Sequence, residues 1–332
     1  MASTYTCIMT AIKTQKKKNS PANNIDLKVG KVIVHLTNQQ KIYFPQDKLS
    51  KGHVVNYYND VAGIMLPYLK DRPQSMNRFP NGINSSGFFQ KDIDVEKSPA
   101  WLQTQSVYAA STQENVDYLI CNNKETLLYM ANLGCIEINP WNSRIKKIDN
   151  PDWMVIDLDP EKIDFIHVVE AANEVKSFFD NLEVECYCKT SGATGLHIYI
   201  PLGAKYDYET VRKFAQVVAQ NIHLRLPEIT SIERSPKRRQ GKVYIDYLQN
   251  SRGQTLAAPY SLRPKPGATV STPLEWREVT KKLLPSDFTI KNILKRLDRK
   301  GDLWKPVMGK GINLSKIVKQ LQDKELIKTK IS

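Results

Sequence analysis

The segment from residue 152 to residue 250 most constrains the fold of this chain, because strand and helix patterns alternate there in a fixed order. Four short apolar or alternating runs are typical of strands: DWMVIDLDP, EVECYCKT, GLHIYIP and KVYIDYLQN. Two longer runs have the apolar spacing of amphipathic helices: IHVVEAANEVKSFF and YETVRKFAQVVAQNIHLRL. The predicted order is therefore strand, helix, strand, strand, helix, strand.

This order matches the split βαβ plan of RRM-like domains. We expect an α+β chain in which an RRM-like catalytic module spans residues 151–300 and a tail follows at 301–332. An N-terminal α/β module is expected over 26–150, after a flexible basic arm at 1–25 that is Lys-rich and polar. No Gly/Pro-rich linker separates the modules, so the boundary near residue 150 is a soft one.

Several elements outside the central segment are also predicted. VGKVIVHLTN alternates like a strand. Ser50 is a plausible N-cap for the helical run KGHVVNYYNDVAGIMLPYL, and Gly134 closes the run KETLLYMANLG. Near the C-terminus, two short helices are expected in TPLEWREVTKKLL and FTIKNILKRLDRKG.

Composition narrows the class of partner. Lys and Arg number 48 against 34 Asp and Glu, and the net charge of +14 favours nucleic acid over other partners. No apolar run approaches the ~20 residues of a membrane span, and the lysines near the start follow its short apolar stretch instead of preceding it. We therefore expect a cytoplasmic, nucleoid-associated protein. The five cysteines have no zinc-type spacing, so reduced thiols are expected.

Asp157 and Asp159 are the strongest chemical signal. They are two residues apart on a strand, so both side chains point to one face, and two adjacent carboxylates are costly to bury unless a cation lies between them. The alternative is a solvated strand end before the Pro160 turn. Asp246 lies on an otherwise apolar strand face, and if its strand is adjacent, three carboxylates converge. Such a set suits two Mg²⁺ or Mn²⁺ ions and phosphoryl transfer.

The loop KTSGATGLH supplies groups for a phosphate. The small residues around Gly192 let backbone N–H groups approach phosphate oxygens, Ser191 and Thr194 add hydroxyls, and His197 follows on the strand. Most Gly-rich loops are plain hairpins, so this signal depends on the neighbouring acids.

Basic and aromatic side chains complete the candidate site. Arg239 precedes the Asp246 strand and Arg263 follows it, so either could bind nucleotide phosphates or be a solvated surface charge. Phe88 and Phe89 lie in the polar stretch NSSGFFQK, where they could stack on a base or anchor a loop in the core.

The chain resembles the polymerase domain of bacterial ligase D and its stand-alone archaeal counterparts, which belong to the archaeo-eukaryotic primase superfamily. The resemblance covers about Leu36 to Trp276. It is carried by RFPNGI with SGFFQK, ANLGCIEINPW, DWMVIDLDP, KTSGATGLHIYIP and KVYIDYLQNSRGQTLAAPYSLRPKPGATVSTPLEW. It implies a primase-type catalytic palm and a primer-extending, gap-filling polymerase in non-homologous end joining that works beside Ku and a DNA ligase.

The resemblance also implies roles for individual residues. The metal-binding acids are matched by Asp157, Asp159 and Asp246. The groups that hold the incoming NTP or dNTP are matched by Ser191, His197 and Arg263, with Arg239 at the active site. Lys41 and Lys51 match a pair that binds the 5′-phosphate of a gap or downstream end. Phe88 and Phe89 match aromatics that stack near the template. The family favours ribonucleotides and often Mn²⁺, and acts on gaps or 3′ overhangs.

Three departures from the family pattern limit this transfer. Thr194 replaces a lysine of the loop, and Asn139 replaces a histidine before Pro-Trp. No Lys-x-Asp-Gly ligase motif is present, so we expect a stand-alone polymerase or an excised domain. Alternative functions are a primase of the same superfamily, a non-catalytic DNA-end-binding scaffold, and a metal-dependent nuclease.

Overall fold

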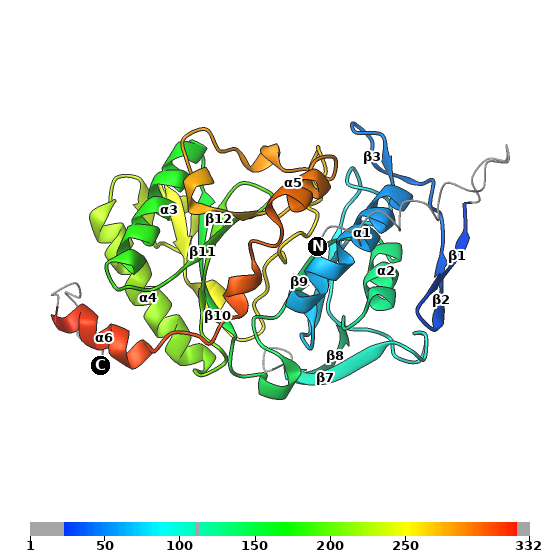
Figure 1. The fold of residues 1–332 in the computed structure, drawn as a ribbon, viewed down its shortest axis with the longest axis horizontal. Helices are drawn as coiled ribbons and strands as arrows, with labels where there is room; N and C mark the ends of the chain where they lie inside the picture. The colour runs from blue at the N-terminus through cyan, green and yellow to red at the C-terminus, as the bar shows by residue number, and fades with distance from the viewer. Residues whose placement is uncertain (1–22, 110–112, 324–332) are drawn as a thin grey trace.

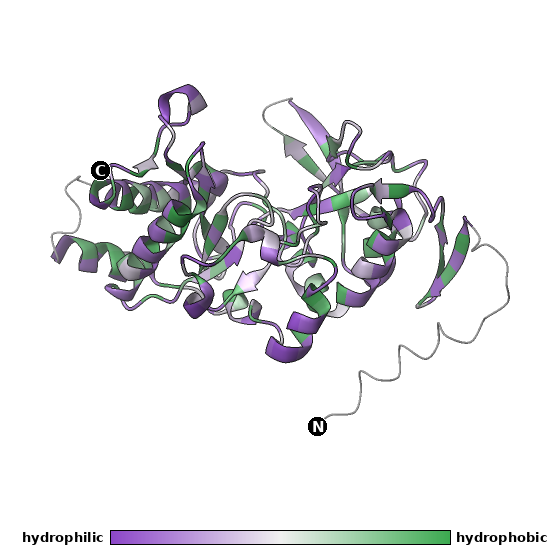
Figure 2. Ribbon diagram, turned by 90° about the horizontal axis from the view of Figure 1, so that it is seen from above, coloured by the Kyte–Doolittle hydropathy of each residue, from purple (hydrophilic) through white to green (hydrophobic). Residues whose placement is uncertain are grey.

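The computed structural model describes residues 23–109 and 113–323. Most of the predicted arm, at residues 1–22, lies outside these ranges, as do 324–332 of the predicted tail. Two α/β lobes lie side by side (Figure 1), one around the central sheet and one around α1 and α2. The helices alternate between purple and green along their length (Figure 2), as amphipathic helices should.

The central sheet has the strand order β13-β14-β10-β12-β11-β15. Its strands are β10 (Trp153–Pro160), β11 (Tyr187–Thr190), β12 (Leu196–Pro201), β13 (Thr230–Ser231), β14 (Val243–Asp246) and β15 (Pro273–Leu274). Strand β12 lies between β10 and β11 and is antiparallel to both, and β14 is antiparallel to β10. This is the predicted split βαβ arrangement, with two short edge strands added.

Two helices cover one face of this sheet: α3 (Phe165–Asp180) and α4 (Tyr208–Arg225). Their apolar stripes and the apolar side of the strands form a continuous buried cluster that includes Met154, Ile156, Phe178 and Val218. Cys186 and Cys188 are buried in the same cluster, and Cys121 and Cys135 are also buried free thiols. Cys7 lies outside the described residues.

The strand predicted over 242–250 ends earlier, at Asp246, and a 3₁₀ turn, η3 (Leu248–Asn250), follows. The strand ends there because the Asn250 side chain takes the place of a further strand residue beside β10. The Asn250 amide accepts from the Val155 N–H at 2.8 Å and donates to the Val155 carbonyl at 2.7 Å. This satisfies the edge of β10 beyond the end of β14.

The N-terminal lobe has a three-stranded sheet, two helices and three hairpins. Its sheet has the order β6-β5-β9, formed by Phe88–Gln90, Gln74–Arg78 and Cys135–Pro140. The helices are α1 (Lys51–Leu69) and α2 (Lys124–Asn132). The hairpins are β1 (Ile25–Val29) with β2 (Val32–Leu36), β3 (Ile42–Phe44) with β4 (Leu49–Ser50), and β7 (Gln103–Ala109) with β8 (Glu114–Ile120).

The helix boundaries in this lobe follow local capping chemistry. Ser50 is the N-cap of α1, as predicted, and its N–H donates to His53 Nδ1 at 3.0 Å. The predicted helix end at Gly134 is also confirmed, since Gly134 follows α2 with φ +83°. The strand predicted in VGKVIVHLTN is confirmed as β2, but it begins only at Val32, because Gly30, at φ +57°, turns the chain between β1 and β2.

The C-terminal elements differ from the prediction. Instead of a helix, the TPLEWREVTKKLL stretch forms β15 and a 3₁₀ turn, η4 (Trp276–Glu278), because Trp276 Nε1 donates to the Cys186 carbonyl at 2.8 Å and ties the segment to β11. The second predicted helix exists as α5 (Ile293–Lys300). In the tail, α6 (Leu314–Asp323) packs on the central sheet's core. Short 3₁₀ turns are η1 (Ile145–Lys147), η2 (Pro236–Arg238), η5 (Pro285–Asp287) and η6 (Lys305–Met308).

The two lobes pack against each other, while the helix-covered face of the central sheet has its own core. An apolar cluster runs from Tyr58 of α1 through Ile138 of β9 to Trp153 and Val155 of β10. The division near residue 150 stays a prediction, and the packing crosses it. Within the described ranges, no helix has the length and apolar character needed to traverse a bilayer.

Candidate active site

The three predicted acids lie on one face of two paired strands. Asp157 of β10 is directly opposite Asp246 of β14, and Asp159 is opposite Tyr244. Because directly opposed residues share a face, as do residues two apart on a strand, the carboxylates converge as the sequence predicted. Asp157 is buried, whereas Asp159 and Asp246 are half-buried.

A polar row crosses the sheet from these acids. The register pairs Asp246 with Asp157, Asp157 with His197 of β12, and His197 with Lys189 of β11. His197 Nε2 lies 3.4 Å from Asp157 Oδ1, and both side chains are buried. Lys189 was missed by the sequence analysis, although its pairing with His197 across the short loop was a usable signal.

The hydrogen bonds of the three acids differ from one carboxylate to the next. Among residues 23–109 and 113–323, no three His, Cys, Asp or Glu side chains form a ready-made metal-binding group. The Asp246 carboxylate instead accepts from Leu248 N at 2.8 Å and Gln249 Nε2 at 3.0 Å. Asp157 Oδ1, however, is buried without a hydrogen bond.

The pKa values of the two acids on β10 are both raised. Burial raises the pKa of the Asp157 carboxyl well above its usual value, and the charges of Asp159 and Asp246 raise it further. Burial and Asp246 also raise the pKa of Asp159. Like charges crowded in a buried place, with one oxygen unsatisfied, fit a divalent cation with hard oxygen ligands. The metal-binding role itself stays a prediction.

The loop between β11 and β12 is folded around one hydroxyl. Ser191 Oγ accepts from Ala193 N at 3.1 Å and from Gly195 N at 3.0 Å. Gly192 has φ +73°, and a Cβ there would lie 2.7 Å from Ser271 N. A Cβ on Gly195 would lie 2.2 Å from the Leu158 carbonyl of β10. The glycines therefore let the loop pack directly against the acidic strand.

Arg263 joins the loop to the N-terminal lobe. Its Nε lies 3.1 Å from Glu137 Oε2 in an ion pair, and its Nη1 donates to the Ser191 carbonyl. Glu137 is buried on β9 and was missed by the sequence analysis, because only the packing of the two lobes brings it to the site. Anchored this way, the guanidinium has a fixed position beside the acids.

Several of these groups, but not Asp246 or Lys189, line a cavity of about 490 Å³. Most of the predicted catalytic and nucleotide-binding residues line it: Asp157, Asp159, Ser191, Thr194, His197 and Arg263. Glu137, Asn139 and Phe89 come from the N-terminal lobe. The Asn139 amide donates to the Ser75 carbonyl at 3.3 Å. The cavity is thus built by both lobes, which is where a ligand site is expected.

Arg239 lies beside the cavity and is not part of its lining. Its guanidinium is 3.7 Å from the centroid of the Tyr244 ring, and its Nη1 is 3.9 Å from Glu161 Oε2. Its charge lowers the pKa of Asp159, against the larger effect of burial. A position near the acids is therefore observed, but direct access to the cavity is not.

Phe88 and Phe89 are exposed, at 48% and 59%, so the core-anchor alternative is excluded. They lie on strand β6 and not in a loop. Phe89 lines the cavity, and Arg78 lies 5.2 Å from the Phe88 ring centroid. An exposed aromatic at the cavity rim is suited to stacking on a base.

Lys41 and Lys51 form a pair of neighbouring lysines that does not line the cavity. Lys51 is the first residue of α1, and its N–H donates to the Lys41 carbonyl at 2.8 Å. Burial, Lys41 and Arg78 lower the pKa of Lys51 to about 8. Clustered positive charge at the start of a 19-residue helix is a favourable place for an anion.

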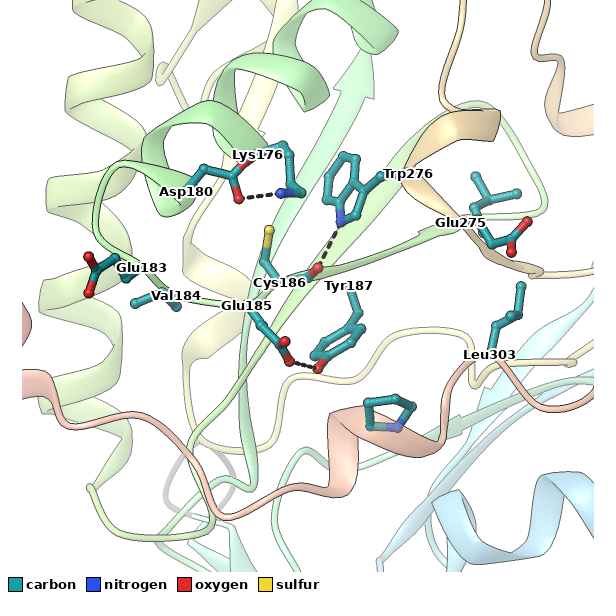
Figure 3. A pocket seen from close by; sticks show the side chains of 12 residues that line it. Lys176, Asp180, Glu183, Val184, Glu185, Cys186, Tyr187, Glu275, Trp276 and Leu303 are labelled. Carbon is teal, nitrogen blue, oxygen red and sulfur yellow. Dashed lines mark hydrogen bonds and ion pairs between the residues drawn. The ribbon is translucent and has the colours of Figure 1, made fainter.

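Another pocket, of about 600 Å³, lies at the end of the sheet formed by β11 and β15 (Figure 3). Trp276 and Tyr187 line it together with carboxylates from Asp180, Glu183, Glu185 and Glu275, and its single lining cation, Lys176, pairs with Asp180 (Figure 3). That charge disfavours a polyanionic ligand in this pocket.

Comparisons with known proteins agree with this geometry. The family model for the LigD primase-polymerase domain matches residues 50–304. The bifunctional non-homologous end joining protein LigD of Bacillus subtilis is 36% identical over 270 residues, covering 81% of this chain and 43% of the relative. The multifunctional LigD of Mycolicibacterium smegmatis is 33% identical over 277 residues, covering 82% and 36%. This chain therefore spans less than half the length of these relatives.

A solved structure is also similar. The polymerase domain from Mycobacterium tuberculosis ligase D, in complex with DNA, superposes with a TM-score of 0.76 at 28% identity. The match covers 83% of this chain and 98% of that domain. With the split βαβ palm and the acids on its open face, the chain belongs to the LigD primase-polymerase domain family, an archaeo-eukaryotic primase-type fold with nucleotidyltransferase activity.

Proposed function

We propose that this chain is a gap-filling polymerase of non-homologous end joining, which adds nucleotides to a primer 3′-OH in the cavity beside Asp157. The observation that carries the proposal is the convergence of Asp157, Asp159 and Asp246 on one sheet face, next to a loop and an arginine suited to a triphosphate. The family relationship supports the same reaction, since the matched relatives are named as end-joining proteins.

The acids would hold Mn²⁺ or Mg²⁺, with Asp157 and Asp159 as the central ligands and Asp246 joining after it releases Gln249. Two bound cations would neutralise developing charge on the phosphates and make the primer hydroxyl easier to deprotonate. The remaining requirement of phosphoryl transfer is positioning, which falls to the protein's own donors.

Three donors face the space where the triphosphate would lie. Ser191 Oγ already accepts two backbone N–H groups, so its own hydrogen is left to donate to a phosphate oxygen. His197 would donate from Nε2. Arg263 would add positive charge from a guanidinium already fixed by Glu137. Gly192 contributes by allowing this loop conformation, and Thr194 is exposed on the loop, where its hydroxyl can reach the ligand.

The DNA end would be bound by other elements. Lys41, Lys51 and the start of α1 would bind a 5′-phosphate on the downstream strand, and their contribution should weaken with added salt. Phe89, with Phe88 beside it, would stack on the template at the cavity rim. Arg239 would add charge near the acids. We further propose that the chain prefers ribonucleotides, acts beside Ku and a separate ligase, and functions in the cytoplasm at the nucleoid.

The test is extension of a labelled primer on a gapped duplex, with and without a downstream 5′-phosphate, comparing ribo- with deoxynucleotides in Mn²⁺ and Mg²⁺. We expect incorporation that is stimulated by the 5′-phosphate. Asp159→Ala should abolish incorporation and keep DNA binding. Extension by the Asp159→Ala variant would contradict the metal role, and synthesis on an unprimed circular template would favour a primase instead.

A further inference from the structure

Lys189 is buried in the sheet beside the proposed triphosphate site, yet no step of the proposed reaction uses it. It is fully buried, and its Nζ has three partners. These are His197 Nδ1 at 2.9 Å, the Ala257 carbonyl at 2.9 Å and Ser271 Oγ at 2.6 Å. Burying this side chain is costly unless it is compensated, and here each of the three N–H groups of an ammonium group would have a polar atom to meet.

The direction of these hydrogen bonds decides the state of His197. The Ala257 carbonyl can only accept. Ser271 Oγ donates its own hydrogen to the Thr190 carbonyl at 2.9 Å, so it accepts from Lys189. If the third N–H goes to His197 Nδ1, that nitrogen carries a lone pair, and the neutral imidazole must carry its hydrogen on Nε2.

The surroundings of His197 Nε2 favour the same tautomer. His197 Nε2 lies 3.4 Å from Asp157 Oδ1. With the hydrogen on Nε2, the ring presents a donor to the carboxylate. With the hydrogen on Nδ1, the Nε2 lone pair would face the ionised form of the Asp157 carboxylate in a buried place, which is unfavourable. The register of three strands therefore places the His197 ring between Lys189 and Asp157, with Nδ1 toward the first and Nε2 toward the second.

We propose that Lys189 is a positioning residue for nucleotide binding, which holds His197 in the Nε2–H tautomer so that the imidazole can donate to a phosphate oxygen. A phosphate oxygen accepts and does not donate, so only this tautomer can bind it through Nε2. The proposal rests on the role proposed above for His197.

The first experiment reads the tautomer directly. In ¹⁵N-histidine-labelled protein, long-range ¹H–¹⁵N spectra distinguish Nε2–H from Nδ1–H, and His197→Ala identifies the signal among the five histidines. We expect Nε2–H in the wild type. Lys189→Met should lose this preference, whereas Lys189→Gln, whose amide can still donate to Nδ1, should largely keep it. A wild type with Nδ1–H, or an unchanged tautomer in Lys189→Met, would overturn the proposal.

The second experiment measures function in a double-mutant cycle. Lys189→Met should raise the nucleotide KM about tenfold or more, the scale of a lost charge-assisted contact, with a smaller change in kcat. In a His197→Ala background the same substitution should add little. An equal loss in both backgrounds would show that Lys189 acts only on the fold. If His197→Ala itself leaves KM unchanged, the proposed function of His197 fails, and the tautomer measurement still decides whether Lys189 sets the ring.

Discussion

Binding of the 5′-phosphate should depend on the protonation of Lys51, because this side chain titrates near neutrality. Burial and the neighbouring charges of Lys41 and Arg78 lower the pKa of Lys51 to about 8, from 10.5. Its positive charge is thus present below pH 8 and lost above it. With that pKa, the charged fraction falls from about 0.9 at pH 7 to about 0.1 at pH 9. If only the ammonium form binds, the phosphate-dependent part of the affinity falls about tenfold.

The assay is fluorescence anisotropy with two gapped duplexes that differ only in a downstream 5′-phosphate or 5′-hydroxyl. The ratio of their dissociation constants isolates the phosphate contact from the rest of the DNA. A terminal phosphate keeps nearly its full charge over this range, because its second pKa is about 6. Lys51→Arg is the matched control, since arginine stays charged at pH 9 and should keep the ratio constant. A pH-independent ratio in the wild type, or the same fall in Lys51→Arg, would refute the reasoning.

The other predictions concern the cavity. Asp159→Asn should lower incorporation by about a hundred- to a thousandfold and remove the rise in melting temperature that Mn²⁺ should give the wild type, as checked by primer extension and calorimetry. Arg263→Lys should raise the nucleotide KM about tenfold in steady-state assays, because an ammonium cannot contact both of its present partners. Gly253→Ala is strained only by its φ of +81° and should lower the free energy of unfolding in urea by about 1–2 kcal/mol. Gly192→Ala should lower it more, because the added Cβ would also lie 2.7 Å from a backbone nitrogen. Phe89→Ala should weaken template binding in anisotropy titrations by about 1–3 kcal/mol, with Phe89→Tyr near wild type.

The elements that the sequence predicted well are those fixed by local periodicity and capping. The run before Asp157 is apolar throughout, so a buried strand ending in acids follows directly. Ser50 occupies the N-cap position of its helix, and its N–H finds an acceptor three residues on, at His53 Nδ1. The strand order then follows from the βαβ connections, and it brings Asp246 beside Asp157.

The features that were missed depend on contacts between distant segments. Asn250 ends the pairing of β14 early because its amide binds the backbone of Val155, 95 positions away in sequence. Trp276 lies outside any α-helix because its indole is committed to Cys186 on β11. Glu137 reaches the site only when β9 packs against the lobe of the central sheet. None of these contacts has a periodic signal in the chain.

The cross-strand row also explains how buried acids can be tolerated. Asp157 in isolation would be destabilising, because burial and two neighbouring carboxylates all disfavour its charge. The charges of Lys189 and Arg263 oppose that effect, and both cations are themselves tied to neutral or acidic partners. Asp157, Asp159 and Arg263 therefore line the same cavity, and Lys189 is buried beside His197. We expect this arrangement to attract a cation to the acids and to leave the guanidinium and imidazole to meet the anion that accompanies it.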